Sequence, residues 1–129
     1  MASSYYKPCK ELEACMKVDQ YWHSKEFDKW FEGYYKIATE TSYPLAECQV
    51  GYSHLEGIGV KQDFEKALYW TQRSAAHSDW DAQYNLAWIY ENGLGVEKNL
   101  ETARYWYKQA ALQAHNLAIQ KCKELGIDL

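Results

Sequence analysis

The sequence predicts an all-α solenoid of antiparallel helix pairs with about seven helices, and three observations carry this prediction. The turn motif Gly-Ile-Gly-Val at residues 57–60 recurs 36 residues later as Gly-Leu-Gly-Val at 93–96. The flanking segments carry apolar residues at the three- and four-residue spacing of an amphipathic helix. The same offset relates the dipeptides Tyr69-Trp70 and Tyr105-Trp106. Tandem units of this length are typical of solenoids, in which each helix pair packs only against its neighbours.

The N-terminal part, residues 1–44, is predicted to form degenerate capping helices that lack the glycine turn. A first helix is expected over about 8–22, where Pro8 suits the first helical position. A second helix is expected over about 24–41, and the hydroxyl of Ser24 can cap it. These atypical helices would close the end of the row, because an open terminal repeat exposes its apolar face.

Two full helix pairs are predicted over 45–114. Within each pair, the glycine that follows the first helix can take a left-handed conformation and end that helix. Asp63 and Asn99 can then cap the second helices, and each is followed by a glutamate in the first turn, where it favours the helix dipole. A lone capping helix over 115–129, ended by a glycine, completes a single domain that spans 1–129.

Composition restricts the function classes. The 129 residues are 47% hydrophobic and 25% charged, which suits one globular domain with a buried core. A formal net charge of −4 argues against a general nucleic-acid binder, which needs a basic face to neutralise phosphates. The sequence shows no signal peptide and no apolar run long enough for a membrane, and its four cysteines are irregularly spaced. We therefore expect a cytoplasmic protein with reduced thiols.

One segment resembles a known repeat family. Residues 82–96 read AQYNLAWIYENGLGV, and the next helix carries Ala103, Tyr105, Trp106, Ala110 and Ala111. This pattern resembles the Sel1-like repeat, a relative of the tetratricopeptide repeat, over the region from about Leu45 to the C-terminus. The resemblance implies a right-handed α-solenoid. Two positions depart from the family pattern: Ala87 stands where the family usually has glycine, and His54 where it has the tyrosine seen at Tyr90.

The resemblance also implies a function, because Sel1-like repeats generally act as adaptors or scaffolds that bind other proteins. No cofactor, metal site or catalytic residue is expected, since the histidines and cysteines show no zinc-ligand spacing. We expect His54, at a core-facing position, to be a packed and hydrogen-bonded imidazole. Some cysteine-rich family members are associated with penicillin binding and hydrolysis, but Cys48 lacks the paired cysteine of those repeats. The chain is therefore predicted not to be an enzyme.

The candidate binding surface is a short aromatic stripe on the first helices of the pairs. If these helices line the concave side, as in the related tetratricopeptide fold, the offset sets Tyr52 beside Trp88 and Cys48 beside Tyr84. Aromatic side chains are enriched at binding hot spots because they offer large, rigid contact areas. The predicted partner-binding residues are Tyr52, Trp88, Tyr84, Cys48, Glu56, Asp81, Glu91, Asn92 and Gln120. The alternative is that the aromatic residues only pack between repeats.

Carboxylates flank this stripe, so the expected partner is a protein or peptide with a lysine or arginine next to an apolar anchor. Neither nucleic acid nor a membrane is expected as a partner, and the oligomeric state is left open. A second hypothesis is an inhibitor or immunity protein that neutralises a basic enzyme or toxin through its acidic surface. An enzyme resembling a β-lactamase is the third and least favoured hypothesis.

Overall fold

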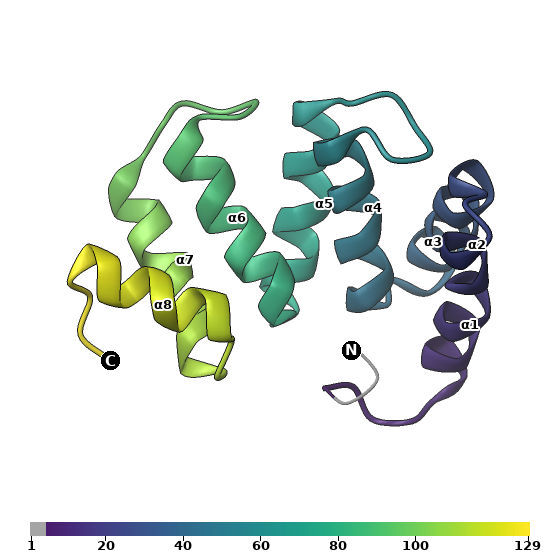
Figure 1. The fold of residues 1–129 in the computed structure, drawn as a ribbon, viewed down its shortest axis with the longest axis horizontal. Coiled ribbons are helices and arrows are strands. Elements are labelled where there is room, and N and C mark those ends of the chain that lie inside the picture. The colour runs from purple at the N-terminus through teal and green to yellow at the C-terminus, as the bar shows by residue number, and fades with distance from the viewer. Residues whose placement is uncertain (1–4) are drawn as a thin grey trace.

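The structure is a computed structural model that describes residues 5–129, and within this range it contains helices and no strand (Figure 1). The helices follow one another along a single row, from α1 at one end to α8 at the other (Figure 1). Their bounds are α1, Lys10–Val18; α2, Gln20–His23; α3, Phe27–Thr41; α4, Pro44–Glu56; α5, Phe64–Ala76; α6, Trp80–Asn92; α7, Leu100–Leu112; and α8, Asn116–Leu125. This arrangement confirms the predicted all-α solenoid of helix pairs.

The predicted first helix is divided into α1 and α2 at Asp19, which keeps helical dihedral angles of φ −59° and ψ −21°. Helices α1 and α2 together therefore correspond to the first of the seven predicted helices. Helix α1 begins later than expected, because the sulfur of Cys9 accepts a hydrogen bond from the Leu12 amide and caps it, which leaves Pro8 outside the helix. Ser24 ends α2 instead of capping α3.

The glycine turns have two separate roles. Gly57 and Gly93 end α4 and α6 with φ of 70° and 65°, as left-handed caps. The second glycine of each turn lies against the start of a second helix. A Cβ on Gly59 would stand 2.0 Å from the carbonyl oxygen of Phe27, and a Cβ on Gly95 would stand 2.8 Å from that of Phe64. The turns therefore pack onto the preceding helix pair in a way that only glycine allows.

The turns between pairs follow the same 36-residue offset. Ser42, Ser78 and Ala114 all take positive φ, of 56°, 69° and 67°, and each stands two residues before the first residue of α4, α6 or α8. Alanines at equivalent positions are buried on the helices that these turns connect: Ala46, Ala82 and Ala118 on the first helices, and Ala67 and Ala103 on the second. Small side chains at these positions let neighbouring helices approach closely, which keeps the interior densely packed.

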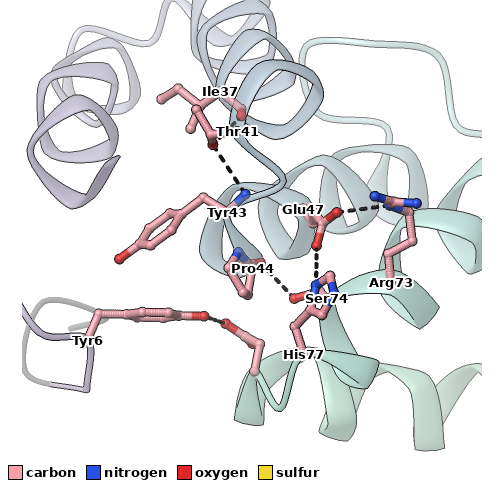
Figure 2. A network of polar contacts seen from close by, with 10 residues as sticks. Tyr6, Ile37, Thr41, Tyr43, Pro44, Glu47, Arg73, Ser74 and His77 are labelled. Carbon is pink, nitrogen blue, oxygen red and sulfur yellow. Dashed lines mark hydrogen bonds and ion pairs between the residues drawn. The ribbon is translucent and has the colours of Figure 1, made fainter. Parts of the chain in front are cut away.

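A buried carboxylate ties α4 to α5. Glu47 is fully buried; it accepts a hydrogen bond from Nε of Arg73 at 2.9 Å and lies 3.1 Å from Nδ1 of His77 (Figure 2). In the next helix pair, Gln83 and Gln113 hold the positions of Glu47 and His77, and the amide of Gln113 donates to Gln83 at 2.9 Å. The same contact between neighbouring helices is thus made with charge in one pair and without charge in the next.

Candidate binding site on the first helices

The helices α2, α4, α6 and α8 form one face of the row, which we call the first-helix face. It is hollowed at two places, the central hollow and the N-terminal hollow. Gln49 and Tyr52 of α4 line both, so the two hollows adjoin. Neither hollow is lined by a lysine or an arginine from the part of the chain that the structure describes. The two hollows therefore combine aromatic, aliphatic, amide, imidazole and carboxylate groups.

The central hollow has a volume of about 300 Å³ and lies between α4, α6 and α8. Tyr84 stacks on the imidazole of His115, with ring centroids 5.0 Å apart. Nδ1 of His115 accepts the Ala118 amide at 3.2 Å, which assigns the ring proton to Nε2, and this N–H donates to Asp81 at 2.8 Å. The residues that line the hollow are Leu45, Cys48, Gln49, Tyr52, Asp81, Tyr84, Asn85, His115 and Leu117.

The N-terminal hollow has a volume of about 390 Å³ and lies where α2 and α3 meet α4. Its aromatic rings are in mutual contact, with centroids 4.9 Å apart for Trp22 and Trp30 and 5.1 Å apart for Trp30 and Tyr34. Burial, together with a hydrogen bond to Asp19, raises the pKa of Tyr34, so its hydroxyl stays protonated and donates. The residues that line the hollow are Asp19, Trp22, His23, Trp30, Tyr34, Gln49 and Tyr52.

Both full helix pairs match one family model. The model is the Sel1 repeat, and it matches residues 44–79 and 80–115, which is more than half of the chain. This chain belongs to the Sel1 repeat family. The first matched repeat holds α4 and α5 and the second holds α6 and α7. Proteins built from Sel1 repeats are generally protein-interaction modules and typically non-catalytic scaffolds.

Two solved Sel1-type structures share the fold. A Sel1 repeat protein from Oxalobacter formigenes has a TM-score of 0.76 and 28% identity, over 87% of this chain and 44% of that one. A protective antigen present in uropathogenic Escherichia coli strains, which displays an SLR fold, has a TM-score of 0.80 and 27% identity, over 90% of this chain and 25% of that one. This chain thus spans less than half the length of either neighbour. None of the curated proteins matches the sequence.

The structure places the nine predicted binding residues in two groups. Cys48, Tyr52, Asp81 and Tyr84 come together in the central hollow. The other five lie outside both hollows: Glu56, Trp88, Glu91, Asn92 and Gln120.

Within the second group, Trp88 is exposed, with 38% of its surface accessible. Asn92 lies beside it and donates its amide to the Trp88 carbonyl at 2.9 Å. Glu91 is already engaged, because it accepts the hydroxyl of Tyr107 at 2.6 Å and pairs with Lys121 at 3.2 Å. Of the second group, Trp88 is therefore the side chain that offers the largest free apolar contact.

Several lining residues were missed by the sequence prediction, for two reasons. Gln49 and Asn85 stand 36 residues apart on the same face as the predicted stripe, so the repeat offset could have identified them. Asp19, Trp22 and Trp30 belong to the degenerate N-terminal helices, where no glycine turn fixes the register with the Sel1 repeats. Without that turn, the offset alone does not show which of their side chains face α4.

A larger cavity of about 640 Å³ lies beside the turn from Gly57 to Asp63, and His54 lines it. The imidazole is packed as expected, edge-on to Phe31 and only 4% exposed, with its pKa lowered by burial and by Lys66. The expected hydrogen bonding is incomplete, because no residue within 5–129 pairs with Nδ1.

The described residues contain no group of three or more histidine, cysteine, aspartate or glutamate side chains arranged to hold a metal ion. All four cysteines are unpaired, and burial raises the pKa of the Cys48 thiol well above its ordinary value, with Asp79 nearby adding to the effect. A buried thiol of this kind does not form the reactive thiolate that cysteine chemistry needs. Within residues 5–129, no helix combines the length and the apolar character required to cross a bilayer.

Proposed function

We propose that this Sel1 repeat protein is an adaptor that binds a segment of a partner protein along its first-helix face, without catalysing a reaction. The observation that carries the proposal is the junction of the two hollows at Gln49 and Tyr52. Because the hollows adjoin, one short segment can place side chains in both at once. Pockets that each take an anchoring side chain are the usual basis of peptide recognition on helical surfaces.

The chemistry of the face indicates the kind of segment. The central hollow has apolar walls at Leu45 and Leu117 and suits an apolar anchor. The amide of Gln49, at the junction, has two donors and an acceptor of the kind that pair with the main chain of an extended peptide. The carboxylates at Asp19 and Asp81 favour a partner that carries a basic residue.

The competing surface is on the second helices. Tyr69 of α5 and Tyr105 of α7 are more than half exposed and stand at equivalent repeat positions. None of the cavities described above is lined by either tyrosine. Exposed aromatic rings that stand away from any of these hollows give a weaker anchor than a face where exposed rings such as Trp88 accompany two hollows, because hot spots lie in pockets that exclude water. A decisive experiment must therefore compare the two faces directly.

Photo-cross-linking makes this comparison. The photoreactive amino acid p-benzoylphenylalanine replaces Trp88 in one protein and Tyr105 in another, and both are irradiated in extract of the source cells. We expect a partner protein to be cross-linked at residue 88 and not at residue 105. The opposite pattern would contradict the proposal and assign binding to the second helices.

We also propose that residues 1–44 and 115–129 cap the two repeats, and that the protein is cytoplasmic. In α8, Lys123 stands where the earlier first helices have the buried Gly51 and Ala87, so a second helix could not pack there in the same register. The unpaired state of the four cysteines supports a cytoplasmic location.

A further inference from the structure

The N-terminal hollow combines aromatic rings with one carboxylate. Trp22 is 39% exposed and Tyr52 is half-buried, and these rings come from different helices, α2 and α4. Trp30 and Tyr34 are buried behind them. A cation that lies over the face of a tryptophan or tyrosine is attracted by the ring quadrupole, and the attraction grows as water is excluded. The hollow therefore provides the ring faces that a cationic group requires.

The carboxylate of Asp19 is held in place through one of its oxygens. Oδ1 accepts the hydroxyl of Tyr34 at 2.5 Å and the indole N–H of Trp30 at 3.4 Å. No donor from residues 5–129 reaches Oδ2, and no lysine or arginine among them pairs with this carboxylate. A carboxylate fixed in this way has an acceptor oxygen available for a charged donor from outside the chain.

We propose that the N-terminal hollow binds the guanidinium group of an arginine side chain from the partner segment. The proposal rests on the proposed function, and it names the residue that the partner contributes. The planar guanidinium stacks on Trp22 and Tyr52 and donates to Oδ2 of Asp19. Lysine fits less well, because an ammonium group does not stack and is more strongly hydrated.

The neighbouring central hollow fixes the context of this arginine. Because Gln49 and Tyr52 line both hollows, a residue in the central hollow lies close along the partner chain to the arginine. The central hollow has apolar walls, so this second residue is apolar. The recognised segment is therefore an arginine followed or preceded closely by an aliphatic side chain.

Two peptides of identical shape test the proposal. The probes are acetyl-Gly-Arg-Leu-Gly-amide and the same peptide with citrulline, which replaces the guanidinium by an uncharged urea. Binding to the whole protein is followed by the NMR signals of the tryptophan indole N–H groups, assigned with Trp22→Phe and Trp30→Phe variants. We expect the arginine peptide to shift the signals of Trp22 and Trp30, and to bind at least about fivefold more tightly than the citrulline peptide. Equal binding of the two peptides would overturn the assignment.

Asp19→Asn isolates the charge. The asparagine keeps an amide oxygen that can accept from Tyr34 and Trp30, so the hollow is preserved, and unchanged citrulline-peptide binding checks this. We expect Asp19→Asn to abolish the preference for arginine. The matched control is Asp28→Asn, which removes an exposed carboxylate on α3 outside the hollow and leaves the preference intact. An equal loss in both variants would mean that only net charge matters, and would overturn the proposal.

The experiment on the arginine site and the experiment on the proposed function can fail independently. The peptide titration judges the hollow, and the cross-linking comparison at Trp88 and Tyr105 judges the binding face. A partner that is cross-linked at residue 88 and binds Asp19→Asn as tightly as the wild type would leave the proposed function in place. It would overturn the arginine assignment.

Discussion

The hydroxyl of Tyr6 donates a hydrogen bond to the buried carboxylate of Asp79, 73 residues further along the chain. Asp79 also caps α6, since its Oδ1 accepts the Ala82 amide at 2.8 Å. Beside this contact, Tyr5 stacks on Trp80 with ring centroids 4.4 Å apart. The segment before α1 therefore connects the N-terminal helices to the turn between the two Sel1 repeats.

The first prediction concerns this connection. Tyr6→Phe keeps the ring but leaves one oxygen of the buried Asp79 carboxylate without its donor. We expect a loss of about 1–3 kcal/mol in the free energy of unfolding, the cost of leaving a buried polar group unsatisfied. Urea denaturation measures it. Tyr5→Phe is the control. Its hydroxyl bonds to the exposed Ser78 carbonyl and to Oε1 of the half-buried Gln113, and neither partner is a buried carboxylate, so this change should cost less. Equal effects of the two variants would contradict the prediction.

The second prediction is the pH dependence of that loss. Burial raises the pKa of Asp79 above 3.8, while the hydrogen bond from Tyr6 lowers it, so Tyr6→Phe should raise it further. A carboxyl group with a raised folded pKa contributes stability below its unfolded pKa, and this stability is lost as pH rises through the folded pKa. The loss in free energy of unfolding caused by Tyr6→Phe should therefore be smaller at about pH 4 than at about pH 7. Denaturation at both pH values checks this, and a deficit that shrinks as pH rises would contradict it.

The glycine turns show how far the sequence could be interpreted. The recurrence at a 36-residue offset predicted the helix pairs and the left-handed caps at Gly57 and Gly93. These are local features, which recur because each repeat packs against a neighbouring repeat of similar sequence in the same chain. The repeat offset relates only residues within the Sel1 repeats. It therefore brought together some of the residues that line the central hollow, but it gave no indication of the N-terminal hollow.

Two other kinds of feature had no signal in the sequence. The contact between Tyr6 and Asp79 joins distant segments, and no periodicity relates them. The hydrogen bond from Trp30 to Asp19 depends on how α3 packs against the start of α2, which the degenerate N-terminal helices do not reveal. Such contacts are set by tertiary packing and not by local pattern, so only the structure shows them.

The third prediction separates the two roles of the turn glycines. Gly57 and Gly59 have the same φ of 70°, but a Cβ on Gly57 meets nothing closer than 3.5 Å, whereas a Cβ on Gly59 would overlap the Phe27 carbonyl. Gly57→Ala should cost about 1–2 kcal/mol for the left-handed backbone alone. Gly59→Ala should cost a further ~1–3 kcal/mol of unfolding free energy, because the turn must move away from α3. Thermal or urea unfolding of both variants measures the difference, and equal costs would contradict the packing described here.

The fourth prediction uses the charged and uncharged versions of the contact between neighbouring helices. Glu47→Gln and His77→Gln each change one partner of the existing contact, and together they recreate the pair seen at Gln83 and Gln113. We expect the double variant to be about 1 kcal/mol or more stable than the sum of the single changes predicts, because contacting residues are not additive. A double-mutant cycle in urea measures this coupling. Additive effects would show that the two repeats do not use the same contact.

The effect of Arg73→Ala sharpens that test. Arg73 is half-buried, and its pKa is raised by the hydrogen bond and the charge of Glu47. Its removal leaves the buried carboxylate with His77 as its remaining partner, and should cost about 1–3 kcal/mol. In the Glu47→Gln background the same change should cost less than about 1 kcal/mol, since no buried charge remains.

The last prediction distinguishes aromatic residues that bind from those that pack. Tyr84 stacks on His115 and contacts Tyr107 edge-on, so Tyr84→Ala should lower the free energy of unfolding by about 2–4 kcal/mol. Trp88 is exposed, and Trp88→Ala should change stability by less than about 1 kcal/mol. If the first-helix face binds the partner, Trp88→Ala weakens capture of the cross-linked partner while the helical content measured by circular dichroism stays that of the wild type. Tyr105→Ala is the control on the opposite helices and should leave capture unchanged. Because Trp88 contributes little to the fold, a loss of binding at that residue reports on the surface itself, and retained binding would show that the partner does not contact the α6 end of the stripe.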